Sequence, residues 1–274
     1  MKNFLKRLLI ILSVTFLLLI GAVAVIANLF EDRIGRALTK TINNQLTAEL
    51  TVQGFDITLF RSFPNLSANL KSVRLEDTEG KPLLEAETIG FRFGLLSLFK
   101  SSLEIGSVVV EGGQLRILID KQGRANYDIL KPGETESSGS EATNIDLTLA
   151  ELRQVAISYT DQSQNQQIKG AVQSALFSGA FSNTAFDLES KAQVQFEFAD
   201  LDGIRYLPGK AVSYDVELAV DLEAGTYALQ RGVLGVDGNI FKVDGTVENW
   251  ETGTYFDLYA TAEEGNLAGV LALL

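Results

Sequence analysis

The feature that most constrains the fold of this chain is an alternation of apolar and polar residues that recurs along most of its length. Successive side chains of a β-strand point to opposite faces of a sheet, so a period of two predicts strands with one apolar and one polar face. The alternation is clearest in the stretches 193–198, 212–221, 241–248 and 256–260. Turn residues separate these stretches at intervals typical of hairpins, namely Asp202-Gly203, Gly225, Asp237-Gly238-Asn239 and Gly253.

The first half of the chain has the same period in shorter runs. We expect strands near residues 55–59, 66–75, 83–93, 103–110 and 115–120. Gly112-Gly113 is expected to separate the last two of these strands, because paired glycines mark turns. Residues 145–161 are expected to form a strand, a short connection and a second strand that ends at Tyr159 and Asp161. The sequence therefore predicts a mainly β fold with a mostly antiparallel sheet.

Residues 8–30 form a run without any charged residue, long enough for a helix that crosses a bilayer. Three basic residues precede the run and two acidic residues follow it, and basic flanks stay on the cytoplasmic side. We therefore expect residues 1–30 to be a cytoplasmic stub and a transmembrane anchor, with the body of the chain outside the cytoplasm. The alternative is a secretory signal cleaved near Ala22-Val23-Ala24, although the apolar region of a signal is only roughly 7 to 15 residues long.

Residues 31–50 are predicted to form one amphipathic helix, because Ile34, Leu38, Ile42, Leu46 and Leu50 recur every four residues. We expect this apolar stripe to pack on the sheet that follows. A helix lying along the bilayer surface is the alternative, and it is less favoured because Lys and Arg do not dominate the polar side.

Composition excludes several classes of partner and site. The net charge is −12 and no cluster of Lys and Arg offsets it, so a nucleic acid is not expected as a partner. Cysteine is absent, which excludes a disulfide framework and thiolate metal sites in this chain. Histidine is absent too, which removes the usual general base, the usual zinc ligand and any Ser-His or Cys-His pair. We therefore expect no enzyme activity, no cofactor and no metal.

Three short matches to catalytic or ion-binding motifs lack the residues that those motifs require. Ser97 and Lys100 fit the S-x-x-K pattern of penicillin-binding enzymes, but no S-D-N or K-T-G segment accompanies them. The segment 200–203 has the start of a calcium loop without its closing glutamate. The glycines at 232, 235 and 238 precede a predicted strand, whereas a phosphate loop precedes a helix.

Residues 132–144 are rich in Glu, Ser, Thr and Gly and are expected to be a flexible loop or linker. This divides the chain into the anchor (1–30), an α+β segment (31–131), the linker (132–144) and a β-rich segment (145–274). The chain stops inside an apolar stretch, residues 267–274, which indicates a fragment or a helix whose partner is missing.

The apolar faces of the predicted strands have two interpretations. In a closed core, two sheets, or a sheet and its helix, bury these faces against each other. In a trough, a curved sheet leaves its apolar face open to lipid acyl chains, since large exposed apolar surfaces mark binding sites. Alternation alone does not decide between them, because it does not reveal what lies opposite a face.

After the apolar run and the helix, several short segments follow in a characteristic order. They are Phe63-Pro64-Asn65-Leu66, then Pro82-Leu83-Leu84 with Ala86, then Leu95-Leu96-Ser97-Leu98-Phe99 ahead of Leu103-Glu104-Ile105, and finally the strand 115–120 with Gly123, Asn126 and Leu130. Their order and spacing resemble the AsmA-like proteins of Gram-negative envelopes, relatives of TamB and of the bridge-like lipid-transfer proteins. Residues 145–161 resemble the second β segment of that family. A proline is common in the family where this chain has Gly112-Gly113.

The resemblance implies an N-terminal transmembrane helix and an amphipathic helix followed by an elongated, curved, mostly antiparallel β-sheet that forms an open groove. It further implies an inner-membrane protein with its body in the periplasm, which guides phospholipids between the inner and outer membranes. The residues expected to line the groove are Val194, Phe196, Phe198, Val212, Val216, Leu218, Phe256 and Leu258.

The expected partners are membrane phospholipids, the inner membrane, and outer-membrane or periplasmic proteins. About a dozen strands at about 4.8 Å each make a groove of only about 60 Å, which indicates missing sequence, self-assembly or a partner. The alternative function is a scaffold or assembly factor for outer-membrane proteins, in which exposed strand edges pair with client strands.

Overall fold

The computed structural model describes residues 35–36, 39–40, 42–44, 46–58, 65–94, 105–131, 147–181, 184–250 and 253–264. The predicted anchor (1–30), the predicted linker (132–144) and the C-terminal apolar stretch (267–274) lie outside these residues. Within the described part of the chain, no helix has the length and hydropathy needed to cross a membrane.

The fold is a single large sheet, in agreement with the mainly β prediction. Its strands are β1 (Leu50–Thr58), β2 (Asn65–Glu76), β3 (Pro82–Gly94), β4 (Ile105–Ile119), β5 (Leu149–Asp161), β6 (Gln166–Ser178), β7 (Ala185–Leu201), β8 (Ile204–Tyr206), β9 (Ala211–Asp221), β10 (Thr226–Val236), β11 (Asn239–Trp250) and β12 (Gly253–Glu264).

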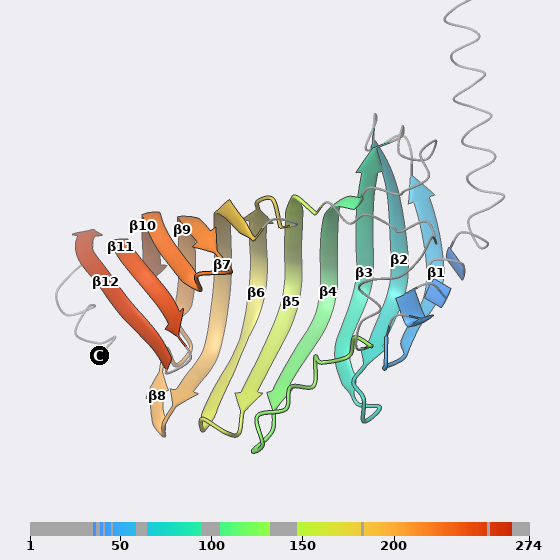
Figure 1. Cartoon of the computed structure of the whole chain (residues 1–274), viewed down its shortest axis with the longest axis horizontal. Helices are drawn as coiled ribbons and strands as arrows, with labels where there is room; N and C mark the ends of the chain where they lie inside the picture. The colour runs from blue at the N-terminus through green and yellow to red at the C-terminus, as the bar shows by residue number, and fades with distance from the viewer. Residues whose placement is uncertain are drawn as a thin grey trace, which may run out of the picture.

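The strands follow one another across the sheet almost in the order of the sequence, from β1 to β12 (Figure 1). The short β8 is the exception, because it pairs only with β7 and lies off the main path. Neighbouring strands are antiparallel except β4 and β5, which are parallel. The predicted turns at Asp202-Gly203, Gly225 and Asp237-Gly238 are confirmed between successive strands. The sheet does not close on itself, because β1 and β12 lie at opposite ends of it.

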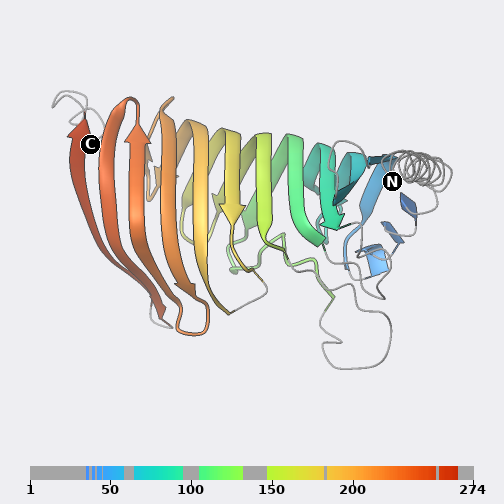
Figure 2. The same cartoon turned by 90° about the horizontal axis from the view of Figure 1, so that it is seen from above.

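Strands β2 to β6 share a kink that crosses the sheet as one row. The residues of this kink row lie opposite one another in the pairing register, and they are Ser72, Glu87, Gly112, Gln154 and Gln173. Ser72, Gly112 and Gln154 have φ values of 50°, 64° and 52°. Irregular residues of this kind bend a strand and increase its twist. Figure 2 shows that the strands curve along their length. A single open sheet curved in this way has a concave side, which we call the groove.

The kink also changes which residues of a strand are buried. In β2 the buried apolar residues are Ala68 and Leu70 on one side of the kink and Val73 on the other, so the apolar positions pass from even to odd numbers. The same change occurs in β6 between Val172 and Ala175. Because side chains alternate with a period of two, such a change keeps the apolar residues of both strand halves on the same face.

Two expectations about strand breaks were wrong for the same reason. Gly112-Gly113 does not separate two strands, since β4 runs through both glycines as a single strand of 15 residues. Residues 149–161 likewise form one strand, β5, and the expected connection is the kink at Gln154. A residue with positive φ inside a ladder interrupts the alternation in the sequence without ending the strand.

One end of the groove is occupied by the segment before β1. Residues 35–36, 39–40 and 42–44 are helical, and Ile42 and Leu46 pack on the core formed by β1, β2 and β3. Gly35 lies against Phe55, where a Cβ would fall 2.1 Å from the ring. The packing of this segment on the sheet is thus confirmed. Its predicted extent was wrong, because Leu46 forms a β-bridge with Leu130 and Leu50 is the first residue of β1.

A strap that follows β4, residues 120–131, fastens this segment to the sheet. The backbone N–H and the Oγ1 of Thr47 both donate to the carbonyl of Ile129, at 2.7 and 2.9 Å. Nζ of Lys131 donates to the carbonyl of Asn44 at 2.7 Å. At the other end of the strap, the amide of Asn126 donates to the carbonyl of Arg116 and its Oδ1 accepts the N–H of Leu118. The strap therefore joins the two ends of the α+β segment.

Candidate functional site

The pairing register defines one face of the sheet that we call the apolar face. Directly opposed residues of neighbouring strands point to the same side, so the register can be followed from strand to strand. One row of small residues crosses from β1 to β10 in this way, consisting of Val52, Val73, Ala86, Gly113, Val155, Val172, Val194, Val212 and Val236. This valine row lies beside the kink row.

The valine row is the deepest part of the apolar face. Val155 is 1 % exposed and Val172 is 5 % exposed. Val172 belongs to a buried cluster with Ala175 and Ala192, and every described residue packed on that cluster comes from the same sheet. Burial without a second layer is expected on the inside of a bend, where neighbouring side chains converge. We conclude that the apolar face lines the inside of the groove.

Further rows of the apolar face extend toward β12 on the other side of the kink row. One consists of Leu188, Leu218, Leu229, Gly245 and Leu258, and the next of Phe186, Val220, Tyr227, Val247 and Phe256. From β6 to β12, the described residues that the register places on this face carry no charge. Such a surface attracts apolar groups and offers no ionic contact inside the groove.

Seven of the eight residues predicted to line the groove lie on the apolar face. Val194, Phe196, Val212, Val216 and Leu218 belong to β7 and β9, and Phe256 and Leu258 belong to the edge strand β12. These seven residues spread along the face and do not form a compact pocket. Val194 and Val212 are directly paired, and Leu218 and Leu258 belong to one row of the face.

Phe198 is the exception, and its expected position was wrong. Phe196 lies opposite Gly170, whereas Phe198 lies opposite Lys169, with a register shift between the two pairs. Gly170 and Lys169 are adjacent in β6, so they point to opposite faces. Phe198 therefore lies on the polar face, where the guanidinium of Arg205 sits 4.5 Å from the centre of its ring. The shift at Glu197 is invisible in the alternating sequence.

Sequence reasoning missed the contribution of β10 to the apolar face. Leu234 lies opposite Tyr214, and Leu229 lies opposite Leu218, although one has an even number and the other an odd number. A register shift between Leu229 and Arg231 accounts for this change. The only signal in the sequence is the apolar pair Val233-Leu234, which breaks strict alternation.

The apolar face contains one pair of hydroxyl groups in its interior. Oγ of Ser190 donates to the hydroxyl oxygen of Tyr214 at 3.2 Å. Ser190 is 4 % exposed, so the contact satisfies a polar group that water does not reach freely.

The opposite face is polar and carries ladders of ion pairs. On β2 to β4, Glu85 accepts from Arg74 at 3.2 Å and from Arg116 at 2.8 Å. On β7 to β10, Asp215 pairs with Lys191 at 2.8 Å and lies 3.5 Å from Arg231. The hydrogen bond from Lys191 lowers the pKa of Asp215 below its ordinary value.

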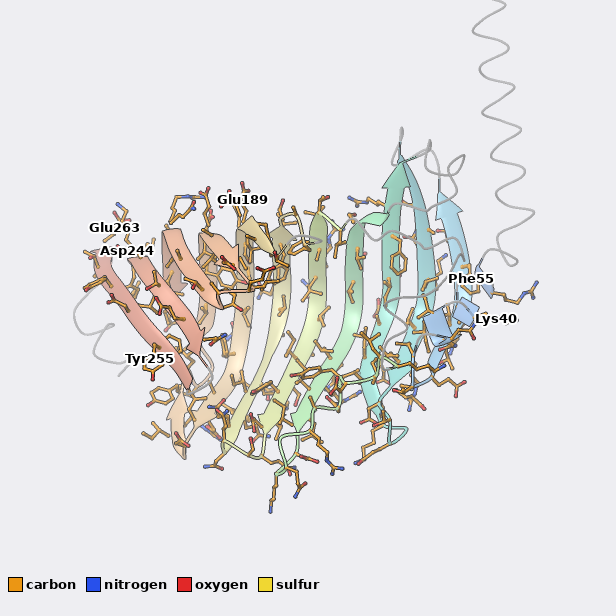
Figure 3. The ribbon with its side chains drawn as sticks, in the orientation of Figure 1. Lys40, Phe55, Glu189, Asp244, Tyr255 and Glu263 are labelled. Atoms are coloured by element: carbon orange, nitrogen blue, oxygen red, sulfur yellow. The ribbon has the colours of Figure 1, made fainter. Side chains whose placement is uncertain are left out.

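A shallow hollow of about 420 Å³ lies over the second ladder, lined in part by Lys191, Gln193, Ser213 and Asp215. Glu189 and Asp244, labelled in Figure 3, belong to the same polar face. In the described residues no group of three His, Cys, Asp or Glu side chains could hold a metal ion. From β6 to β12 this arrangement separates an ionic outer surface from an uncharged inner one.

Comparison with known proteins agrees with this architecture. The model of the AsmA family matches residues 1–204, which is more than half of the chain. The search of curated proteins found no match, and the search of solved structures found none either. A family match of this extent covers residues 1–30, the strap and the sheet as far as the start of β8. The chain belongs to the AsmA family.

Proposed function

We propose that this protein binds the acyl chains of phospholipids along its apolar face and guides the lipids between the inner and outer membranes. In this proposal residues 1–30 anchor the chain in the inner membrane and the sheet lies in the periplasm. The observation that carries the proposal is the uncharged apolar face inside an open groove. Membership of the AsmA family supports the same role.

The groove suits a lipid because its two sides differ in chemistry. Each CH₂ group of an acyl chain gains about 0.8 kcal/mol when it leaves water for an apolar surface. The open side of the groove leaves the charged head group in contact with water, which avoids the cost of burying a charge. The free energy that an acyl chain gains on entering the groove nearly equals the free energy that it loses on leaving the bilayer. Movement along the groove therefore requires a continuous apolar path and a gradient or an energy-coupled partner, and no chemical reaction.

The helical segment and the strap limit where an acyl chain can lie. They cover part of the apolar face at β1 to β3, where Leu50, Leu70 and Ile89 are less than 10 % exposed. From β9 to β12 the rows of large apolar residues have no described element over them, and Leu258 is 46 % exposed. We therefore place the accessible acyl path on the strands that follow β5.

The test is lipid co-purification with variants of two residues on that path. Phe196→Asp and Val216→Asp put a carboxylate beside the acyl chains, where an unpaired charge is strongly disfavoured. We expect the lipid content measured by native mass spectrometry to fall at least about tenfold, the effect of about 1.4 kcal/mol in binding.

Matched controls come from the polar face. Phe198→Asp changes the same residue type two positions away from Phe196 but on the other side of the sheet, next to Arg205. Ser213→Asp is the control for Val216→Asp, because it places a carboxylate on the same strand at an exposed position of the polar face. Both controls should keep the lipid content of the unmodified protein. Equal lipid content in all four folded variants would refute the proposed path.

The assembly of outer-membrane proteins is a second candidate function, favoured by the outer edge of β12, with which no described strand pairs. In that function a client strand pairs with the edge. Cross-linking in intact cells distinguishes assembly from lipid transfer. Trapped β-barrel proteins without bound lipid would support assembly, whereas bound lipid without trapped client proteins would support transfer.

A further inference from the structure

The two edge strands of the sheet, β1 and β12, differ in whether other residues cover their outer edges. At β1 the edge is capped, since the side-chain amide of Asn43 donates to the carbonyl of Leu50 at 2.8 Å and its Oδ1 accepts the N–H of Leu50 at 2.7 Å. At β12 the described residues provide no equivalent, because β12 pairs with β11 alone. An edge strand left in this state presents a row of backbone donors and acceptors to another strand.

The β12 edge is only weakly protected: its register shift lies at one end, at Glu263, and Asp257 is the one charged residue in the stretch 254–262. Residues 254–262 pair with β11 without a bulge and contain neither Lys nor Pro. Large apolar side chains are exposed on both of its faces, namely Tyr255 (50 %), Phe256 (68 %), Leu258 (46 %) and Tyr259 (63 %). Tyr255 is labelled in Figure 3 on this outermost strand. The surface therefore has the properties of an interface.

We propose that the β12 edge pairs with the β12 edge of a second copy of this chain, antiparallel, about a two-fold axis at Tyr259. The argument is the order of side-chain sizes along the strand. With Tyr259 opposite its own copy, Phe256 lies opposite Ala262 and Leu258 lies opposite Ala260. Both pairs put a large residue against a small one on the apolar face.

On its other side, where β12 pairs with β11, large residues also lie opposite small ones. Leu258 lies opposite Gly245 of β11, and Ala262 lies opposite Phe241. Few strands can pair with themselves in this way, because the large residues must all lie on one side of the axis and the small ones on the other. In β12 they do.

The charges of β12 fit the same register. Asp257 lies opposite Thr261, so no two carboxylates between residues 254 and 262 face each other. Each chain still carries a net charge of −12, which opposes association at long range. Salt screens such repulsion, so the dimer should become more stable as the ionic strength rises.

The partner copy completes the groove. A two-fold axis perpendicular to the sheet leaves both apolar faces on the same side, so the Leu258 row of each copy continues into the row of the other copy that contains Ala260. One copy has eleven strands along its path, which at about 4.8 Å per strand is about 50 Å, and two copies form a groove of about 100 Å. The inference extends the proposed lipid path, but its structural argument does not depend on lipid.

The test is disulfide cross-linking of the full chain, purified in mild detergent. Because the protein has no cysteine, single-cysteine variants report one position only. In Tyr259→Cys the two introduced thiols lie directly opposite each other, within the Cα separation that a disulfide requires. In Asp257→Cys the two thiols are four residues out of register, about 13 Å apart. We expect the Tyr259→Cys dimer to form at least about tenfold faster than the Asp257→Cys dimer, and a mixture of Asp257→Cys and Thr261→Cys to cross-link as a heterodimer.

Three results would overturn the dimer. The first is a Tyr259→Cys rate no higher than that of Asp257→Cys in folded protein. The second is a disulfide within one chain between the cysteine at position 259 and a cysteine placed in residues 265–274. The third is a cross-link in cells from position 259 to a different protein. None of these results changes the lipid content expected for Phe196→Asp. Failure of the dimer and failure of the lipid path are therefore distinguishable.

Discussion

Gly113 sits where the row of small residues crosses the kinked part of β4. Its φ is 124°, a region that other residues rarely adopt. A Cβ at this position would lie 1.9 Å from the carbonyl oxygen of Glu85 on β3. The position therefore requires both the conformational freedom and the small size of glycine. The close approach of β3 and β4 at the floor of the groove depends on it.

Gly113→Ala should destabilise the protein strongly. Backbone strain costs about 1–3 kcal/mol, and the displacement of β3 adds to it. The matched control is Gly123→Ala in the strap, which has a φ of 80° but where a Cβ would meet no atom within 4 Å, so only the strain of about 1–3 kcal/mol applies. Urea unfolding measures both. Equal losses in the two variants would mean that the contact with Glu85 is relieved at no cost.

The strap is the element that decides which part of the apolar face is covered. Ile129 is 7 % exposed and its carbonyl accepts two hydrogen bonds from Thr47, whereas the neighbouring side chain of Leu130 is 71 % exposed. One residue of the strap is thus buried against the sheet while the next points to solvent. This contrast allows the anchoring of the strap to be tested without changing its backbone bridge to Leu46.

Ile129→Ala should cost about 2–5 kcal/mol, because it removes a buried side chain and leaves a cavity. Hydrogen exchange followed by mass spectrometry should then show faster exchange in residues 120–131 and in β1, with little change in β9 to β12. Leu130→Ala, the control, should stay within about 0.5 kcal/mol of the unmodified protein. Uniformly faster exchange across the whole sheet after Ile129→Ala would show that the strap is not a separate unit.

The kink row is a second feature that acts on whole strands, because it keeps their apolar residues on one face. Ser72, Gly112 and Gln154 come from three strands that are far apart in the sequence, yet their irregular residues align. Each one shifts its strand by one residue relative to strict alternation. Because all the shifts occur in the same row, the apolar face continues across the kink without interruption.

At the scale of the whole molecule, stability should fall in acid. Hydrogen bonds lower the pKa of Asp120, Asp161, Asp200 and Asp215, the largest contribution coming respectively from the backbone of Arg124, the hydroxyl of Ser163, the guanidinium of Arg205 and the ammonium of Lys191. In the unfolded chain an aspartate has a pKa of about 3.9, so below that pH the unfolded state binds more protons than the folded state.

The free energy of unfolding should therefore be nearly constant between about pH 5.5 and 8, where no histidine titrates, and should fall below about pH 4. Chemical denaturation at a series of pH values measures this. Asp215→Asn should weaken the acid dependence, since it removes one of the groups whose pKa is lowered. A transition near pH 6.5 would contradict the expectation.

The sequence by itself determined that the chain is mainly β and that its strands have one apolar and one polar face. With the exception of Phe198, it also determined which residues of β7, β9 and β12 share the apolar face. The period of two is a local property, so it can be read along a single strand. The same holds for the turns at Asp202-Gly203 and Asp237-Gly238.

Only the tertiary structure decided where the alternation of side chains is shifted by one residue. Phe198 changed faces, β4 and β5 proved continuous, and Leu229 and Leu234 joined one surface, each because of an irregular residue whose effect depends on the partner strand. A shift of one residue inverts every side chain beyond it. The capping of β1 by Asn43, and the edge of β12 with which no described strand pairs, are likewise properties of pairing. They arise from contacts between distant segments, which a periodicity within one segment does not contain.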